Sequence, residues 1–278
     1  MRPFTTRLAA IFAAAALVSV AFAACGDDES DQSLTFTLSG DGKAATFTAP
    51  ESAEAGVAEI TLQNEGDKAG DLQLIRVEGD RSPEEVVEGL GKAMKGQAFP
   101  DWFFAAGGTG PVEAGQSETV TQVLEPGTYY AFDTEGGAPP KPEDAVSVEV
   151  SGESSDEGIE ADATISAVDY GFEGEGLTAG SAEVAFENTG AQPHHIVYAP
   201  LTGNATAEDV ETFFKSEKGK PPFEEKDTQN TAVIEAGETQ LVDLELKKGR
   251  YVLLCFITDR KGGPPHVAKG MIDEVEVE

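Results

Sequence analysis

The stretch "VEAGQSETVTQVLEPGTYYAFD" (Val112–Asp133) is repeated without a gap as "IEAGETQLVDLELKKGRYVLLC" (Ile234–Cys255), at a constant offset of 122 residues. Each copy has a Glu-Ala-Gly segment, a run in which apolar and polar residues alternate, a glycine turn and a second apolar run. Alternation with a period of two predicts a half-buried β-strand. The repeat therefore predicts two copies of one β-rich unit.

A second pair of matching stretches lies upstream of each copy. "NEGDKAGDLQLIRV" (Asn64–Val77) matches "NTGAQPHHIVYAPL" (Asn188–Leu201) at an offset of 124 residues, so only two residues of length separate the blocks. Between the copies, serine, glycine and acidic residues without apolar periodicity predict a linker at residues 151–158. We therefore expect one domain over residues 33–150 and a second over residues 159–278.

Short alternating runs separated by glycine and proline turns occur in both halves, among them "SLTFTL", "AEITLQN", "AEVAFEN" and "TQLVDLEL". Each half also has one stretch with a helix N-terminus: Ser82 precedes Pro83, and Thr206 stands three residues before Asp209. The predicted fold class is all-β: two tandem Greek-key β-sandwich domains, each with a short helical insertion.

The N-terminal segment has the features of an export signal. Residues 1–24 contain Arg2 and Arg7, then an alanine-rich apolar run, and end in small residues before Cys25. The cleavage position resembles the bacterial lipobox, which implies that Cys25 is lipidated and that residues 25–32 form an acidic tether; a plain secretory peptide is the alternative. We expect an extracytoplasmic lipoprotein anchored to the cell membrane, at the bacterial cell surface or in the periplasm. The lipid would be its only membrane contact.

The acidic composition narrows the possible partners. The net charge is −32, and it becomes −34 without the two arginines of residues 1–24. Such a charge repels nucleic acid and attracts cations or a basic protein face. We therefore expect a redox or surface protein as partner and no nucleic acid. If Cys25 is lipidated, Cys255 is the remaining thiol.

The residues that can bind a soft metal ion gather in the second half. All three histidines lie there: His194 and His195 at the start of one strand, and His266 in the loop after Cys255, with Met271 five residues later. One thiolate, two imidazoles and a thioether are the ligands of a blue-copper electron-transfer site. Strand alternation allows only one of His194 and His195 to point inward.

On these residues the second domain resembles the cupredoxins, the family of plastocyanin and azurin. "QPHHIVY" is similar to the strand of the first histidine, and "PPHVAKGM" to the loop of copper nitrite reductases. The resemblance implies a type 1 site with one copper ion, held by His194, Cys255, His266 and Met271, with His195 as the alternative to His194. The sequence departs from the small carriers by having ten residues between Cys255 and His266.

The first domain has none of these ligands. The offsets place Gly70 and Asp71 opposite the two adjacent histidines, and Asp133 opposite Cys255. We expect a degenerate cupredoxin-like domain without copper ligands and with a structural role. Asp71 and Asp133 together allow the further hypothesis of a weak site for a hard cation.

The sequence therefore predicts a lipid-anchored, copper-binding one-electron carrier and not an enzyme, because three histidines cannot supply additional copper centres. Two alternatives stay open. One is a metal-free, two-domain surface module for binding or adhesion, and the other is copper storage or delivery without electron transfer.

Overall fold

The computed structural model describes residues 32–40, 45–137, 140–154, 159, 161–216 and 218–278. The predicted signal, the lipidation position Cys25 and the tether up to residue 31 lie outside the described residues. In the described residues, β-strands make up most of the regular secondary structure, and there are two α-helices, α1 and α2. Neither helix is long and apolar enough to cross a membrane.

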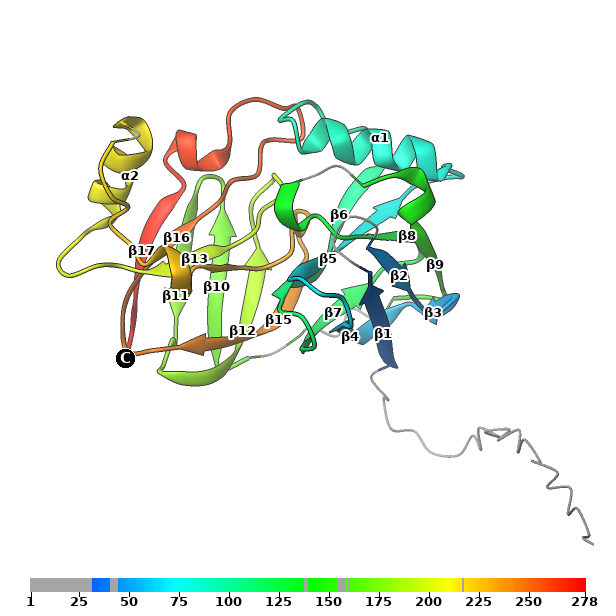
Figure 1. Ribbon diagram of the computed structural model, residues 1–278, viewed down its shortest axis with the longest axis horizontal. Coiled ribbons are helices and arrows are strands. Elements are labelled where there is room, and N and C mark those ends of the chain that lie inside the picture. Colours follow the sequence, from blue (N-terminus) through cyan, green and yellow to red (C-terminus); the bar gives the residue numbers. More distant parts are fainter. Residues whose placement is uncertain (1–31, 41–44, 138–139, 155–158, 160, 217) are drawn as a thin grey trace, which may run out of the picture. The chain divides into compact units, whose positions relative to one another are not determined.

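The described residues of the first half form nine strands and the helix α1, which Figure 1 labels. Their bounds are β1 (Gln32–Ser39), β2 (Thr46–Thr48), β3 (Ser52–Glu54), β4 (Gly56–Asn64), β5 (Gly70–Val77), α1 (Pro83–Ala93), β6 (Phe103–Val112), β7 (Ser117–Leu124), β8 (Gly127–Phe132) and β9 (Val146–Ser151). Short 3-10 turns lie at Glu135–Gly137 and Pro142–Asp144.

In the second half, eight strands and the helix α2 lie within the part of the chain that the structure describes. Their bounds are β10 (Ala163–Val168), β11 (Gly171–Glu175), β12 (Gly180–Asn188), β13 (Val197–Pro200), α2 (Ala207–Ser216), β14 (Gln229–Asn230), β15 (Thr239–Leu246), β16 (Gly249–Leu254) and β17 (Ile272–Val277). Further 3-10 turns lie at Glu225–Asp227 and His266–Lys269.

One eight-stranded sheet runs through both halves, in the order β11-β10-β12-β15-β7-β4-β1-β2. Each half contributes four strands, and the two sets of four are arranged alike. The pair β1–β4 is parallel like β10–β12, and the pair β4–β7 is antiparallel like β12–β15. The halves meet where β15 pairs antiparallel with β7, with Gln240 opposite Gln122. The repeated stretch that predicts the fold therefore also forms the junction.

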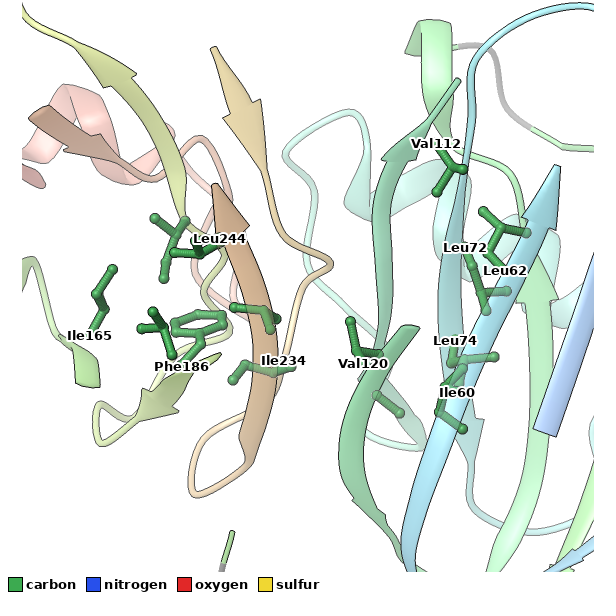
Figure 2. Close-up of a cluster of buried hydrophobic side chains, with 14 of the residues drawn as sticks. Ile60, Leu62, Leu72, Leu74, Val112, Val120, Ile165, Phe186, Ile234 and Leu244 are labelled. Atoms are coloured by element: carbon green, nitrogen blue, oxygen red, sulfur yellow. The ribbon is translucent and has the colours of Figure 1, made fainter. Parts of the chain in front are cut away.

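A smaller sheet packs against each part of the long sheet. The first half has the order β3-β9-β8-β5-β6, and the second has β14-β13-β16-β17. Alternate side chains of the facing strands are buried between the sheets, as for Ile60 and Leu62 of β4 against Leu72 and Leu74 of β5. Figure 2 shows these side chains, with Phe186 in the corresponding core of the second half. The predicted β-sandwich fold class is confirmed.

The helices cover the outer faces of the two smaller sheets. In α1, Ser82 is the N-cap and forms a capping box with Glu85, as its sequence predicts, and Val86 and Leu90 pack on the sheet. In α2, Val210 packs on Val252 and the neighbouring strands. The two predicted helical insertions are thus confirmed.

The junction between β7 and β15 contains buried polar side chains that are hydrogen-bonded to one another. The Gln240 amide donates to Gln122 Oε1 at 2.8 Å and to the Gly108 carbonyl at 2.7 Å, and the Gln122 amide donates to the Ala106 carbonyl at 2.8 Å. Gly108 has a φ of 118°, and a Cβ there would lie 1.8 Å from the Leu72 carbonyl oxygen. The close backbone approach at this point requires glycine.

Candidate metal centre

Three separate segments bring His194, Cys255 and His266 together at one end of the second half. His194 forms a backbone bridge with Ile234, donating to and accepting from it at 3.0 and 2.9 Å. Cys255 follows directly after β16, and His266 opens the 3-10 turn that leads to β17. A backbone bridge, the end of a strand and a tight turn therefore fix the backbones of His194, Cys255 and His266, respectively.

The side chains of these three residues converge on a single point. Cys255 Sγ lies 3.7 Å from His194 Nδ1 and 3.5 Å from His266 Nδ1, and the two Nδ1 atoms lie 3.1 Å apart. All three residues are 0% exposed. Within the described part of the chain, they form the group of histidine, cysteine and acidic side chains that is arranged to hold a metal ion.

The other two sequence candidates lie beside this cluster. Met271 is fully buried in the same core as Cys255, and its backbone N–H donates to the His266 carbonyl at 3.0 Å. The ring of His195 turns away from the cluster, and its Nε2 accepts the Phe256 N–H at 3.0 Å. Of the two adjacent histidines, His194 is therefore the one whose ring faces Cys255.

Two carboxylates contact the outer edges of the histidine rings. Asp169 Oδ1 lies 3.2 Å from His194 Nε2, and Asp259 Oδ1 lies 3.1 Å from His266 Nε2. An ionised carboxylate only accepts hydrogen bonds, so each contact favours the tautomer that has its proton on Nε2 and a lone pair on Nδ1. The partner of the outer nitrogen thereby orients the inner nitrogen toward Cys255.

Burial keeps these rings uncharged. It lowers the pKa of His194, although Asp169 opposes the shift, and it lowers the pKa of His266 to about 4. Burial also raises the pKa of the Cys255 thiol to about 12. Two imidazole lone pairs and one sulfur thus face each other away from water, an arrangement that a soft cation satisfies. The donor set fits a copper ion.

The ten residues between Cys255 and His266 contact the first half of the chain. Arg260 donates to the carbonyls of Pro100 and Phe103 at 3.1 and 2.9 Å, and it forms an ion pair with Glu235. The Phe99 N–H donates back to the Arg260 carbonyl at 2.7 Å. The long loop therefore connects the metal centre to the segment that follows α1.

The equivalent position in the first half is closed by hydrogen bonds. Asp71 accepts the Thr134 hydroxyl at 2.6 Å and the Glu135 N–H at 3.2 Å, and Asp133 accepts the Asp71 N–H at 3.2 Å. Burial raises the pKa of Asp71 to about 7, with a further contribution from Asp133. A hard-cation site at Asp71 and Asp133 stays a prediction.

Sequence reasoning did not find Asp169, Asp259 or Arg260. The chain contains 51 acidic residues, and no spacing rule separates the two that touch histidines from the rest. Asp259 and Arg260 offered one signal, because they lie in the unusually long loop between two predicted ligands. An insertion beside a metal site is a reason to look for outer contacts.

The fold and the centre define a class: a β-sandwich protein with a buried site of two histidines and one cysteine. No family model and no curated protein matches the sequence. Similar solved structures include sodium-dithionite-reduced auracyanin from the photosynthetic bacterium Roseiflexus castenholzii, at 22% identity, 41% coverage of this chain, 94% of that chain and a TM-score of 0.27.

Auracyanin B is 19% identical, covering 41% of this chain and 86% of that one with a TM-score of 0.28. A copper-containing nitrite reductase from Thermus scotoductus is 12% identical, covering 90% of this chain and 62% of that one with a TM-score of 0.21. The candidate metal site is argued from the geometry of His194, Cys255 and His266.

Proposed function

We propose that this protein binds one copper ion in its second half and carries one electron at a time. The observation that supports the proposal is the convergence of His194 Nδ1, His266 Nδ1 and Cys255 Sγ within 3.7 Å of one another. His194, Cys255 and His266 would hold the ion, and Met271, buried in the same core, is the candidate for a weak fourth ligand.

The bound copper ion would supply the one-electron chemistry of a blue-copper site. The chain contributes the environment for it. The end of β16 holds Cys255 in place, the backbone bridge with Ile234 holds His194, and complete burial keeps water from the donor atoms. The carboxylates of Asp169 and Asp259 orient the rings from outside. A rigid, dry site of this kind changes little when the charge of its ion changes.

A carrier is favoured over an enzyme because no histidine is left to bind a second copper ion. The sequence has three, of which two face Cys255 and the third accepts the Phe256 N–H. A second catalytic copper centre would need more of them. The partner would then be a redox or surface protein, with a basic face that complements the net charge of −32.

We propose, further, that the halves are tandem copies of a cupredoxin-like domain, with boundaries at residues 33–150 and 159–278. The repeated sequence and the mirrored strand order of the long sheet support this assignment. We also propose that the mature protein is a lipoprotein, attached outside the cytoplasm through Cys25. The basic, apolar and small-residue order of residues 1–24 supports this.

Titration of the mature chain with copper tests the function. We expect one equivalent of copper(II) to bind and to produce an intense visible thiolate-to-copper band, which Cys255→Ala and His194→Ala abolish. The matched control is His195→Ala, which removes the adjacent ring outside the cluster and keeps the band. Copper bound without the band would support storage or delivery instead. An absence of binding would support the metal-free surface module.

A further inference from the structure

The outer edges of the two histidine rings are covered by acidic side chains from different segments. Asp169 lies in the turn between β10 and β11, and Asp259 lies in the loop after Cys255. Tyr170, next to Asp169 in the chain, donates its hydroxyl to Asp259 Oδ1 at 3.0 Å. Its ring also packs edge-on against the His266 ring, with 5.2 Å between the ring centroids. Tyr170 thus links the two carboxylates at the outer side of the histidine cluster.

Each carboxylate is held in place independently of the histidine that it contacts. Asp169 accepts the backbone N–H of Ala191 at 3.0 Å and that of Gln192 at 3.3 Å. Asp259 accepts from Tyr170 and forms an ion pair with Lys269, and these hydrogen bonds outweigh burial and lower the pKa of Asp259. The two positions are therefore fixed, and the histidine rings align to them.

The charges of the two carboxylates differ in their effect on a bound ion. Both lie one imidazole ring away from the converging Nδ1 atoms, so both stabilise a higher positive charge there. Asp259 shares its charge with Lys269, whereas the further partners of Asp169 are neutral backbone groups. Asp169 should therefore contribute more to the difference between a divalent and a monovalent ion.

We propose that Asp169 and Asp259 are positioning residues that hold both histidines with Nδ1 inward and make the centre prefer copper(II) over copper(I). The part of this inference that concerns copper rests on the proposed function. The part that concerns ring orientation and proton position does not, because it is a property of the polypeptide alone.

The first experiment uses the metal-free protein. Nitrogen-15 NMR of the imidazoles should find the proton on Nε2 in both His194 and His266. In Asp259→Leu, which lacks the acceptor, the His266 ring should populate the other tautomer while His194 is unchanged. A wild-type proton on Nδ1 of either ring would overturn the positioning role. This measurement decides that role even if the protein binds no copper.

The second experiment measures copper affinity and reduction potential. Outer-sphere partners typically change metal affinity by about 10- to 100-fold, so Asp169→Leu should weaken copper(II) binding by that factor and copper(I) binding less. If the affinity for copper(II) falls tenfold more than the affinity for copper(I), the one-electron reduction potential rises by about 59 mV. Asp169→Asn and Asp259→Asn, which keep an acceptor and lose the charge, should raise the potential, with the larger shift for Asp169.

Asp273→Asn is the matched control. Asp273 is a half-buried carboxylate of the same half that accepts the Phe172 N–H at 2.8 Å and contacts neither histidine. Its replacement should leave the potential and both affinities unchanged. Equal shifts in Asp273→Asn and Asp169→Asn would show that only the overall charge matters and would overturn the proposal. A copper-binding wild type whose potential is unaffected by either asparagine variant would also overturn it.

Discussion

Replacing Arg260 with alanine should destabilise the whole protein, although this residue lies in a loop. Its guanidinium donates to two carbonyls of the first half and pairs with Glu235, whose carboxylate also accepts the Ala105 N–H at 3.3 Å. Glu235 is only 9% exposed at its side chain and Arg260 is 24% exposed. Alanine would leave a buried carboxylate without its countercharge.

The magnitude follows from what is removed. Removing one partner of a buried ion pair lowers the free energy of unfolding by about 3–5 kcal/mol. Because Arg260 is partly exposed, we expect a loss at the lower end of this range. The hydrogen bonds to Pro100 and Phe103 belong to the same group and are not added separately. We expect a loss of about 3 kcal/mol in the free energy of unfolding.

Urea unfolding followed by tryptophan fluorescence measures this loss. Trp102 is the only tryptophan, and its ring packs 6.1 Å from that of Phe103, whose carbonyl accepts from Arg260. The control is Arg250→Ala, which removes the pair with the one-third-exposed Glu274 within the second half and should cost less. A loss below about 1 kcal/mol in Arg260→Ala would refute the stabilising role of the Arg260–Glu235 pair.

The pH dependence adds a second test. Burial raises the pKa of Glu235, and Arg260 opposes that shift. Without Arg260, the pKa of Glu235 in the folded state rises further above its value in the unfolded chain. Between these two pKa values the folded protein keeps the proton on Glu235, whereas the unfolded chain releases it. The deficit of the variant relative to wild type should therefore be smallest below the unfolded pKa of about 4.3. It should grow as the pH rises through the folded-state pKa.

Three further substitutions have defined outcomes. Gly190→Ala would place a Cβ 2.5 Å from Asp169 Oδ1 without replacing a candidate ligand. A competition titration should therefore show copper binding that is weaker by about 10- to 100-fold. An unchanged copper affinity would contradict the positioning role of Asp169. Gly108→Ala would collide with the Leu72 carbonyl, and we expect almost no folded protein by circular dichroism. Ser82→Ala removes the N-cap of α1 and should cost about 1 kcal/mol in urea unfolding, with an unaltered copper spectrum.

The sequence was sufficient to predict the sandwich and its helices because those depend on local patterns. In the repeated stretch, alternation in "ETVTQVL" and "TQLVDLEL" corresponds to strands β7 and β15, whose alternate residues are buried. Ser82 and Glu85 predict a helix start by chemistry within four residues. The pairing of β7 with β15 depends on how two distant surfaces meet, and no local pattern determines it.

At the metal centre, residue type alone selects candidates, because cysteine and histidine are rare here. Those candidates include the three residues whose side chains converge, but the choice between His194 and His195 needed the ring directions. Asp169 carries no signal in the sequence, and Asp259 is marked only by its place in the long loop, because the role of both carboxylates would come from the histidines that they contact. The fourth-ligand role of Met271 stays a prediction.

The continuous sheet also determines which strand edges are exposed. A strand at the edge of a sheet presents unpaired N–H and carbonyl groups that can recruit another chain. In this protein β7 and β15 cover each other's edges, so each half shields a strand that would otherwise be a template for aggregation. The first half therefore covers one edge strand of the half that contains the candidate metal site.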